Sequence, residues 1–313
     1  MKRTVLVAIL VAVGGLSIGA AALQQQQQKP QNVRQIQKLR DNLFFISGGQ
    51  LAERDTWTGG NCMVLVGDKG VVLVDTMLPG AGRGILAQIK SVTDKPVTMI
   101  INTHTHFDHT GSNTEFPSTV EFVAHENTRA NLAREKCQPV TNCDAFKGEN
   151  TKYLPKRTYK DKLTLFSGKD QVDLYYFGRG HTSGDTFVVF PAARAMHAGD
   201  MFPRAHMPFI DVANSGGSAV EFNSTLQKAV TTIKNVDTVV GGHTFTPVTW
   251  NDFKAYTDFY KDFFTGAQDA MKKGTAVDAF AKAYRVADKY KGFTADANSV
   301  KADADAIWAE SKK

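Results

Sequence analysis

The stretch INTHTHFDHTG, residues 101–111, places three of the chain's eight histidines and one carboxylate within six positions, directly after an apolar run. Side chains alternate in an extended segment, so His104 and His106 project to one side and can reach a single metal ion. Asp108 and His109 must then point elsewhere, and a second ion about 3.5–4 Å from the first is the economical explanation. Six residues cannot complete two metal sites, so the fold must bring further ligands to this point.

Further candidate ligands occur in the same local setting, at the end of a short apolar run and beside glycine. They are His181, Asp200 and His243. Strand ends are where α/β folds commonly gather their sites, because the core holds the strand while the following loop carries the chemistry. Glycine at such a position lets the backbone crowd close to an ion. The pattern therefore predicts one metal centre built from several strand ends.

Strand-length apolar runs rich in β-branched residues recur through the first 240 positions. The predicted strands are Leu43–Ile46, Cys62–Val66, Val71–Val74, Val97–Ile101, Val120–Val123, Val172–Phe177, Thr186–Phe190 and Val236–Val240. Helical patterns cover Arg83–Val92, Glu126–Lys136, Ala219–Lys234, Asn251–Lys272 and Thr275–Tyr290. The first three strands, separated by short turns, indicate an antiparallel meander. Sheets covered by helices predict an α/β or α+β sandwich.

Three cysteines and one polar segment remain to be placed. Cys137 and Cys143 could form a disulfide, although their spacing does not establish it, and Cys62 lies in an apolar run typical of a buried thiol. Residues 137–160 read as an inserted loop, either functional or merely solvated. Aromatic residues in the region after residue 250 repeat near helical spacing, which predicts a core-facing stripe.

The N-terminus predicts export. A basic start is followed by an uncharged run from Thr4 to Leu23, so we expect a signal peptide over residues 1–22, with an uncleaved membrane anchor as the alternative. A Gln-rich disordered tether is expected over residues 23–38, and one folded domain over residues 39–313 with C-terminal helices from about residue 251. A periplasmic or secreted location follows, with no stable membrane span after cleavage.

The formal net charge is +6, with acidic and basic residues interspersed along the chain. Without a concentrated basic stripe we expect no nucleic-acid partner. The oligomeric state is left open by the sequence.

These motifs resemble those of the metallo-β-lactamase superfamily. The match comprises HTHFDH at 104–109, GHTSGD at 180–185, AGD at 198–200 and GGH at 241–243, in the family's order. The resemblance implies the αββα sandwich, two mixed β-sheets flanked by helices, with the metals at one edge between the sheets. Such motifs are specific for fold and metal binding, and much less specific for substrate.

Matched position by position, the resemblance assigns the ligands of two zinc ions. It assigns His104, His106 and His181 to the first ion, and Asp108, His109 and His243 to the second. Asp200 matches the bridging aspartate of the glyoxalase II and lactonase branches. Met201 stands where one β-lactamase subclass has a cysteine ligand, so the chain is nearer to the subclass with a second-site histidine.

The resemblance implies a dinuclear zinc hydrolase, with iron or manganese as alternative metals. Hydroxide formed from metal-held water would attack the carbonyl of a lactam, lactone, ester or thioester in a small-molecule substrate. Asp108 would orient this nucleophile and move its proton. A phosphodiester or sulfate-ester hydrolase and a non-catalytic zinc-binding protein are the alternatives.

The remaining side chains divide into expected supports and expected substrate contacts. Asp75 and Asp185 are expected to hold the ligand loops, and His125 and His197 to be structural. The expected substrate contacts are Trp57, Phe202, His206 and Phe209.

Overall fold

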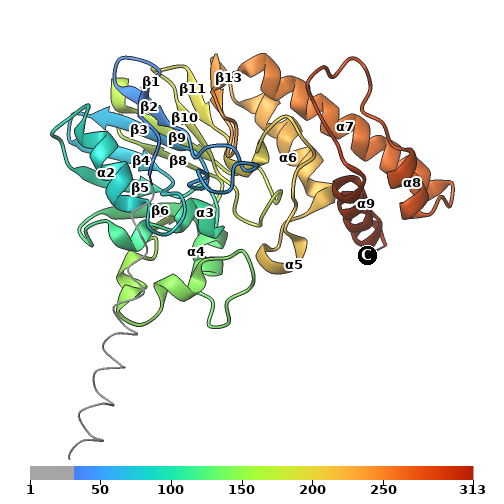
Figure 1. Cartoon of the computed structure of the whole chain (residues 1–313), viewed down its shortest axis with the longest axis horizontal. Helices are drawn as coiled ribbons and strands as arrows, with labels where there is room; N and C mark the ends of the chain where they lie inside the picture. Colours follow the sequence, from blue (N-terminus) through green and yellow to red (C-terminus); the bar gives the residue numbers. More distant parts are fainter. Residues whose placement is uncertain (1–31, 313) are drawn as a thin grey trace, which may run out of the picture.

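A computed structural model describes residues 32–312 of the chain. The expected signal peptide and the first part of the expected tether lie outside the described residues. Within residues 32–312, two β-sheets pack face to face and helices cover both outer faces (Figure 1). This is the predicted αββα sandwich, with α2 on the outer face of one sheet and α6 and α7 on the outer face of the other.

Among the described residues, the first sheet has seven strands and the second has six. The first sheet runs in the order β1 (Gln37–Lys38), β2 (Leu43–Ile46), β3 (Cys62–Gly67), β4 (Gly70–Val74), β5 (Val97–Ile101), β6 (Glu121–His125) and β7 (Arg157–Tyr159). The second runs in the order β13 (Val248–Thr249), β12 (Thr238–Val240), β11 (Ala195–His197), β10 (Phe187–Phe190), β9 (Val172–Tyr175) and β8 (Lys162–Leu165). Strands β1 to β4 pair antiparallel, which confirms the predicted meander, and β4 to β7 pair parallel.

The α-helices are α2 (Gly82–Lys90), α3 (Phe107–Thr110), α4 (Glu126–Leu132), α5 (Val212–Ser215), α6 (Ala219–Thr232), α7 (Trp250–Lys272), α8 (Val277–Ala283) and α9 (Ala297–Ser311). Helices α6 and α7 pack on the second sheet, and α8 and α9 pack against these two helices (Figure 1). The predicted aromatic stripe of α7 is confirmed, because Tyr256, Phe259, Tyr260 and Phe263 are fully buried there. In the part of the chain that is described, no helix is both long and apolar enough to cross a membrane.

Alternation along each strand divides the core into layers. Leu43 and Phe45 of β2 face the second sheet, whereas Phe44 and Ile46 face the layer that contains α2. This follows from the two-residue period of a strand, which sends successive side chains to opposite faces. The sheets thus bury apolar residues on both faces, and their strand ends remain free to carry polar loops.

Three predicted boundaries need correction. The pattern beginning at Glu126 ends its helix at Leu132, because the chain turns there into the loop that follows Arg134. The pattern beginning at Thr275 forms only α8, since Tyr284 leaves the helix and packs its ring against Phe263. Residues 32–38 of the expected tether belong to the folded domain, where Val33 is buried and β1 pairs with β2.

Candidate metal centre

The candidate ligands converge at one edge of the sandwich from four strand ends. His104 and His106 follow β5, and Asp108 and His109 lie in the short helix α3 that comes next. His181 lies in the loop between β9 and β10, Asp200 follows β11, and His243 follows β12. The first sheet therefore supplies four candidate ligands and the second sheet three, and all seven are predominantly buried.

The first group of ligand atoms belongs to His104, His106 and His181, whose atoms all lie within 4.8 Å of one another. The Nε2 atom of His181 is 2.9 Å from the Nδ1 atom of His106. The Nε2 atom of His104 is buried and has no hydrogen-bond partner among the described residues. Three imidazole nitrogens directed at one point are a typical zinc ligand set.

The second group belongs to Asp108, His109 and His243. The Nε2 atoms of His109 and His243 are 3.5 Å apart, and the Oδ2 atom of Asp108 is 3.4 Å from Nε2 of His243 and 3.8 Å from Nε2 of His109. The arrangement matches the set of residues that the resemblance assigns to a second ion.

Asp200 lies between the two groups. Its Oδ2 atom is 3.5 Å from Nε2 of His181 and 3.2 Å from Nε2 of His243, and its Oδ1 atom is 3.4 Å from Nε2 of His109. Gly242 is required beside it, because a Cβ atom there would be 1.7 Å from Oδ1 of Asp200. The carboxylate is thus placed where it can contact ions in both groups.

Carboxylates behind the histidines fix the orientation of two rings. Asp75 accepts hydrogen bonds from Nδ1 of His109 at 2.7 Å and from the backbone and hydroxyl of Thr103. Asp211 lies 3.1 Å from Nε2 of His106. Each carboxylate holds one nitrogen of its ring. The other nitrogen of that ring faces the ligand group and is free to bind a metal. Asp75 has the supporting role expected for it, whereas Asp211 was missed.

Burial and neighbouring charges shift the pKa values of the candidate ligands. Burial lowers the pKa of His104 well below its ordinary value. Burial also acts to lower the pKa of His109, but nearby carboxylates, Asp200 first among them, outweigh it and hold this pKa well above the ordinary value. The imidazoles of His243 and His109 likewise overcome burial and hold the pKa of Asp200 well below its ordinary value. Buried ligands of this kind fit divalent cations, which would compensate both the carboxylates and the unpartnered nitrogen.

The other predicted supports lie close to the ligands without belonging to either group. Asp185 accepts hydrogen bonds from the backbone and hydroxyl of Thr182, which shapes the loop that carries His181. His197 is buried and bonds to the carbonyl of Asn61 and the backbone NH of Gly199. His125 caps α4, accepting from the backbone NH of Asn127, and stacks on Tyr176.

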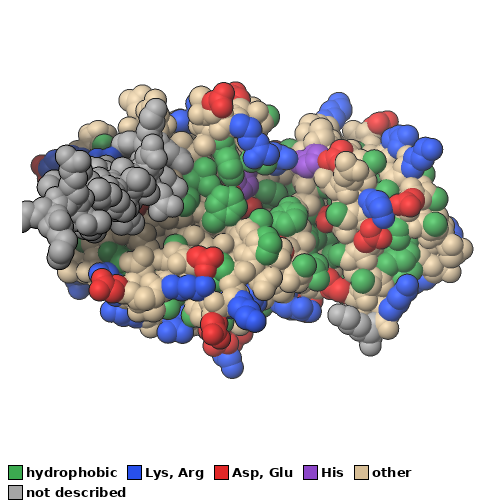
Figure 2. Space-filling model, turned by 60° about the horizontal axis from the view of Figure 1, so that its bottom comes forward, with side chains coloured by type: hydrophobic (Ala, Val, Ile, Leu, Met, Phe, Trp, Pro, Cys, Tyr) green, Lys and Arg blue, Asp and Glu red, His purple; other side chains and the backbone are tan. Residues whose placement is uncertain are grey.

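A cavity of about 690 Å³ opens onto both ligand groups. Figure 2 shows histidine side chains in a hollow bordered by hydrophobic groups. Trp57, His206 and Phe209, three of the expected substrate contacts, line it together with Arg204. Trp57 Nε1 is buried without a hydrogen-bond partner among the described residues, and Phe209 is 57% exposed. Both are placed to meet a substrate, and this role stays a prediction.

The prediction for Phe202 is wrong. Its side chain is only 1% exposed, and it packs against Phe253 and Tyr256 in the layer between the second sheet and α7.

His206 lines the cavity, but its ring nitrogens already bond to Thr294 at 2.7 Å and Asp296 at 3.1 Å. His206 therefore ties the cavity wall to the segment before α9.

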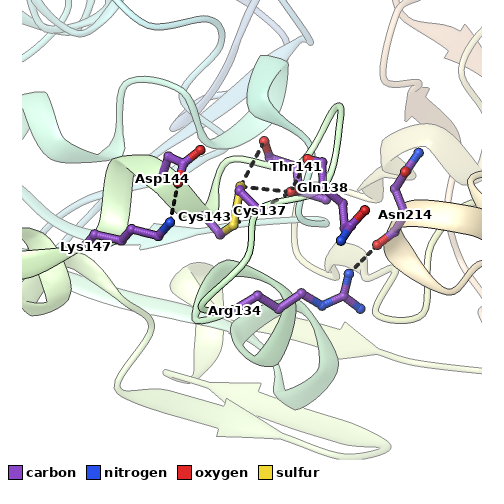
Figure 3. The surroundings of a disulfide bond; sticks show 8 residues. All are labelled: Arg134, Cys137, Gln138, Thr141, Cys143, Asp144, Lys147 and Asn214. Atoms are coloured by element: carbon purple, nitrogen blue, oxygen red, sulfur yellow. Dashed lines mark hydrogen bonds and ion pairs between the residues drawn. A yellow bond between two sulfur atoms is a disulfide. The ribbon is translucent and has the colours of Figure 1, made fainter.

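The inserted loop contributes one side of the cavity. Cys137 and Cys143 form a disulfide (Figure 3). Val140, in the loop between them, lines the cavity. The carbonyl of Val140 accepts from the backbone NH of Phe107 at 3.0 Å, and Asn142 donates to the carbonyl of Thr110 at 3.0 Å. These bonds join the disulfide loop directly to α3. The insertion is therefore part of the site rather than a free excursion.

Comparisons with known proteins agree with this geometry. A family profile described as the metallo-beta-lactamase superfamily matches residues 55–243. A metallo-beta-lactamase type 2 of Elizabethkingia meningoseptica is 26% identical over 240 residues, covering 73% of this chain and 85% of that protein. The alpha subunit of a 2,4-dinitroanisole O-demethylase of Nocardioides sp. is 32% identical over 144 residues, which are 44% of this chain and 40% of that subunit.

Two solved structures share the fold. The inverting sec-alkylsulfatase Pisa1 of Pseudomonas sp. matches with a TM-score of 0.67 and 14% identity, covering 90% of this chain and 50% of that one. A metallo-beta-lactamase of Pontibacter korlensis matches with a TM-score of 0.58 and 18% identity, covering 74% of this chain and 99% of that one. The chain thus spans only about half of the alkylsulfatase, and these likenesses concern the fold.

Proposed function

This chain belongs to the metallo-beta-lactamase superfamily of hydrolases, and on that premise we propose that it is a dinuclear zinc hydrolase acting on the carbonyl of a lactam, lactone, ester or thioester. The observation that carries the proposal is the convergence of His104, His106, His181, Asp108, His109, Asp200 and His243 at one end of a cavity. Iron or manganese would also suit these ligands.

Two zinc ions held there would supply Lewis acidity and a water of lowered pKa. Asp108 is 8% exposed and lines the cavity, so its carboxylate is placed to orient a water and to accept its proton. Trp57 and Phe209 would hold the apolar part of the substrate and exclude water from it. The relatives' names include β-lactamases, which supports ring-opening of a lactam as one activity to test.

The test is hydrolysis of a chromogenic cephalosporin, a lactone, a thioester and a simple ester by the zinc-loaded protein, with and without a chelator. We expect chelator-sensitive turnover of at least one of them. Asp108→Asn should lower kcat by about a hundred- to ten-thousandfold. Zinc content measured on the same samples separates a loss of proton transfer from a loss of metal. Absence of turnover on the whole panel, with both zinc ions bound, would refute carbonyl hydrolysis.

A second candidate function is hydrolysis of a sulfate ester or phosphodiester. Arg204 lines the cavity and forms no ion pair within the described part of the chain, so it could meet an anionic group. Chromogenic sulfate and phosphodiester substrates distinguish this function from acyl hydrolysis. Arg204→Ala should then raise KM for the anionic substrates and leave neutral esters unaffected.

We also propose that the protein acts in the periplasm or outside the cell. The apolar run from Thr4 to Leu23 and the disulfide between Cys137 and Cys143 support this location. The mass of the protein recovered from the periplasmic fraction is the test. A form lacking about 22 N-terminal residues is expected, and an intact form held in the membrane would contradict cleavage.

A further inference from the structure

Helix α9 forms one wall of the cavity that opens onto the metal centre. Asn298, Ser299, Ala302 and Asp303 line the cavity from successive turns of this helix. Residues three and four positions apart lie on the same side of a helix, so these four form a continuous strip. The cavity therefore joins the metal ligands to a largely polar strip of side chains on α9.

Asp303 is out of place for a residue in the core-facing stripe of an amphipathic helix. The buried residues of α9 are Val300, Asp303, Ala304 and Ile307, and three of the four are apolar members of the core. Helical periodicity favours an apolar residue at each of these positions. Asp303 is only 3% exposed, so its carboxyl group is held in the core at the edge of the cavity.

The carboxyl group of Asp303 has no partner there. Its Oδ2 atom is fully buried without a hydrogen bond, and neither oxygen forms an ion pair with any of residues 32–312. Burial raises the pKa of this carboxyl well above its ordinary value. A buried polar group without a partner destabilises a fold, so its presence calls for an explanation.

A second unpartnered polar group lies in the same apolar core as α9. The hydroxyl of Tyr256 on α7 is buried and has no hydrogen-bond partner among the described residues. Burial raises the pKa of Tyr256, and the charge of Asp303 raises it further. By contrast, His206 and Asp296 on the same wall bond to each other. On the α9 side of the cavity, Asp303 is thus the buried acidic group that lacks a hydrogen-bond partner among the described residues.

Resting on the proposed hydrolase function, we propose that Asp303 determines substrate specificity by binding a hydrogen-bond-donating group of the substrate, away from the bond that is cleaved. The group is a hydroxyl, an amide N–H or an ammonium, because each supplies the donor that the carboxyl group of Asp303 lacks. A substrate with only hydrocarbon at this position would leave the carboxyl unsatisfied. The unpartnered carboxyl of Asp303 would then lower the stability of the fold in exchange for substrate selection, as is common for functional residues.

Binding and turnover are measured with a homologous series of straight-chain alkanoates and their nitrophenyl esters. Each member is compared with the same chain carrying a terminal hydroxyl or a terminal amine. Calorimetry with the zinc-loaded protein gives the affinity of the acids, and initial rates give kcat/KM for the esters. We expect one chain length at which the hydroxyl or amino form is preferred by about tenfold or more.

Two substitutions at Asp303 distinguish the donor groups. Asp303→Leu should abolish the preference and raise the melting temperature, because it fills a core position with an apolar side chain. Asp303→Asn should keep the preference for the hydroxyl, since the amide oxygen still accepts, and lose the preference for the amine. Asp305→Asn is the matched control, because Asp305 is exposed on the same helix and pairs with Lys301 at 2.8 Å.

The proposal is overturned if the wild-type protein shows no preference in binding or in turnover, or if Asp303→Leu retains the preference. Loss of stability in Asp303→Leu with the preference intact would assign Asp303 a structural role. Hydrolysis of the esters without any preference would refute the role of Asp303 alone. A preference in binding without hydrolysis would refute the proposed function and leave this inference standing.

Discussion

At the scale of single residues, the centre depends on side chains that no metal would touch. Asp75 bonds to the ring of His109, in the second ligand group, and Asp211 lies against the ring of His106, in the first. Each carboxylate fixes which nitrogen of its histidine faces the group. The two ligand groups therefore have separate supports and can be weakened separately.

Asp75→Asn and Asp211→Asn should each lower the affinity for one zinc ion by about ten- to a hundredfold. Asp75→Asn is expected to weaken the ion held by His109, and Asp211→Asn the ion held by His106. Titration with a competing chelator measures the two affinities. Asp94→Asn is the control, because Asp94 is exposed and pairs with Lys90 at 2.6 Å rather than with a ligand. Equal weakening of both ions by either variant would show that the supports do not act separately.

The residue scale is also where sequence reasoning reached its limit. The seven candidate ligands could be found because histidine and aspartate stand beside glycine after apolar runs. Asp211 carried no such signal, since it follows an irregular segment and an aspartate there is an ordinary surface residue. Phe202 and Phe209 are identical in type and seven positions apart, yet one is in the core and the other is exposed. The difference in their burial is set by the path of the chain after Asp200, which the residue type does not reveal.

At the scale of elements, α9 is held by its first turn. Asp296 caps the helix by accepting from the backbone NH groups of Asn298 and Ser299, and it also lies against His206. The hydroxyl and backbone NH of Ser299 lower the pKa of Asp296 from 3.8 to about 2. The start of α9 is thereby tied to the cavity wall that Asp303 shares.

Asp296→Ala should lower the free energy of unfolding by about 1 kcal/mol at neutral pH. Because the folded-state pKa is depressed, the contribution is present above pH 3.8 and is lost as the pH falls through about 2. Urea unfolding at several pH values measures this difference. A difference between variant and wild type that persisted below pH 2 would mean that the carboxylate is not its source.

The disulfide loop is the second element with a measurable role. Arg134, just before this loop, donates to the carbonyl of Asn214 in α5, next to the segment that carries Asp211 (Figure 3). The loop itself bonds to α3, which carries Asp108 and His109. The loop and the residue before it are thus hydrogen-bonded to α3 on one side and to α5 on the other.

Replacing both Cys137 and Cys143 by serine should destabilise the protein by about 2 kcal/mol, as expected for a loop of this length. KM should rise, since Val140 would no longer be held in the cavity wall. Reduction of the wild type should reproduce the effect, and a reductant should not affect the double variant. Cys62 does not interfere, because it is buried and its burial raises the pKa of its thiol. An unchanged KM would separate the loop from substrate binding.

Most elements could be predicted because they are short apolar runs with a clear period. The eight predicted strands are all present, whereas β1, β7, β8 and β13 were missed because these strands are short and rich in polar residues. Helices α4 and α8 ended early, since helical propensity does not reveal where a side chain is drawn to another partner. The sequence did not predict the order of strands within the sheets, and the resemblance implied only that two mixed sheets form a sandwich.

At the scale of the whole molecule, the metal centre joins the two sheets. Four candidate ligands follow the first sheet and three follow the second, and Asp200 lies between the groups. In addition to the apolar core between the sheets, the ionisable side chains of the candidate ligands connect the two sheets at this edge. Removal of the metals should therefore weaken the whole fold and not only the site.

A chelator should lower the melting temperature by about 5–10 °C, because each ion at a hundredfold excess over its Kd contributes about 2.7 kcal/mol. Added zinc should restore both the melting temperature and the activity. Native mass spectrometry of the same samples should count two ions. Recovery of full stability with a single ion bound would indicate a mononuclear centre.

The candidate ligands are also spread along the chain, from His104 to His243. No shorter piece of the chain contains the complete set, so the metal can be acquired only after both sheets have formed. For a chain that crosses a membrane unfolded, this acquisition takes place in the compartment where folding is completed. The metal supply of that compartment, rather than of the cytosol where the chain is synthesised, would then decide which ion the protein carries.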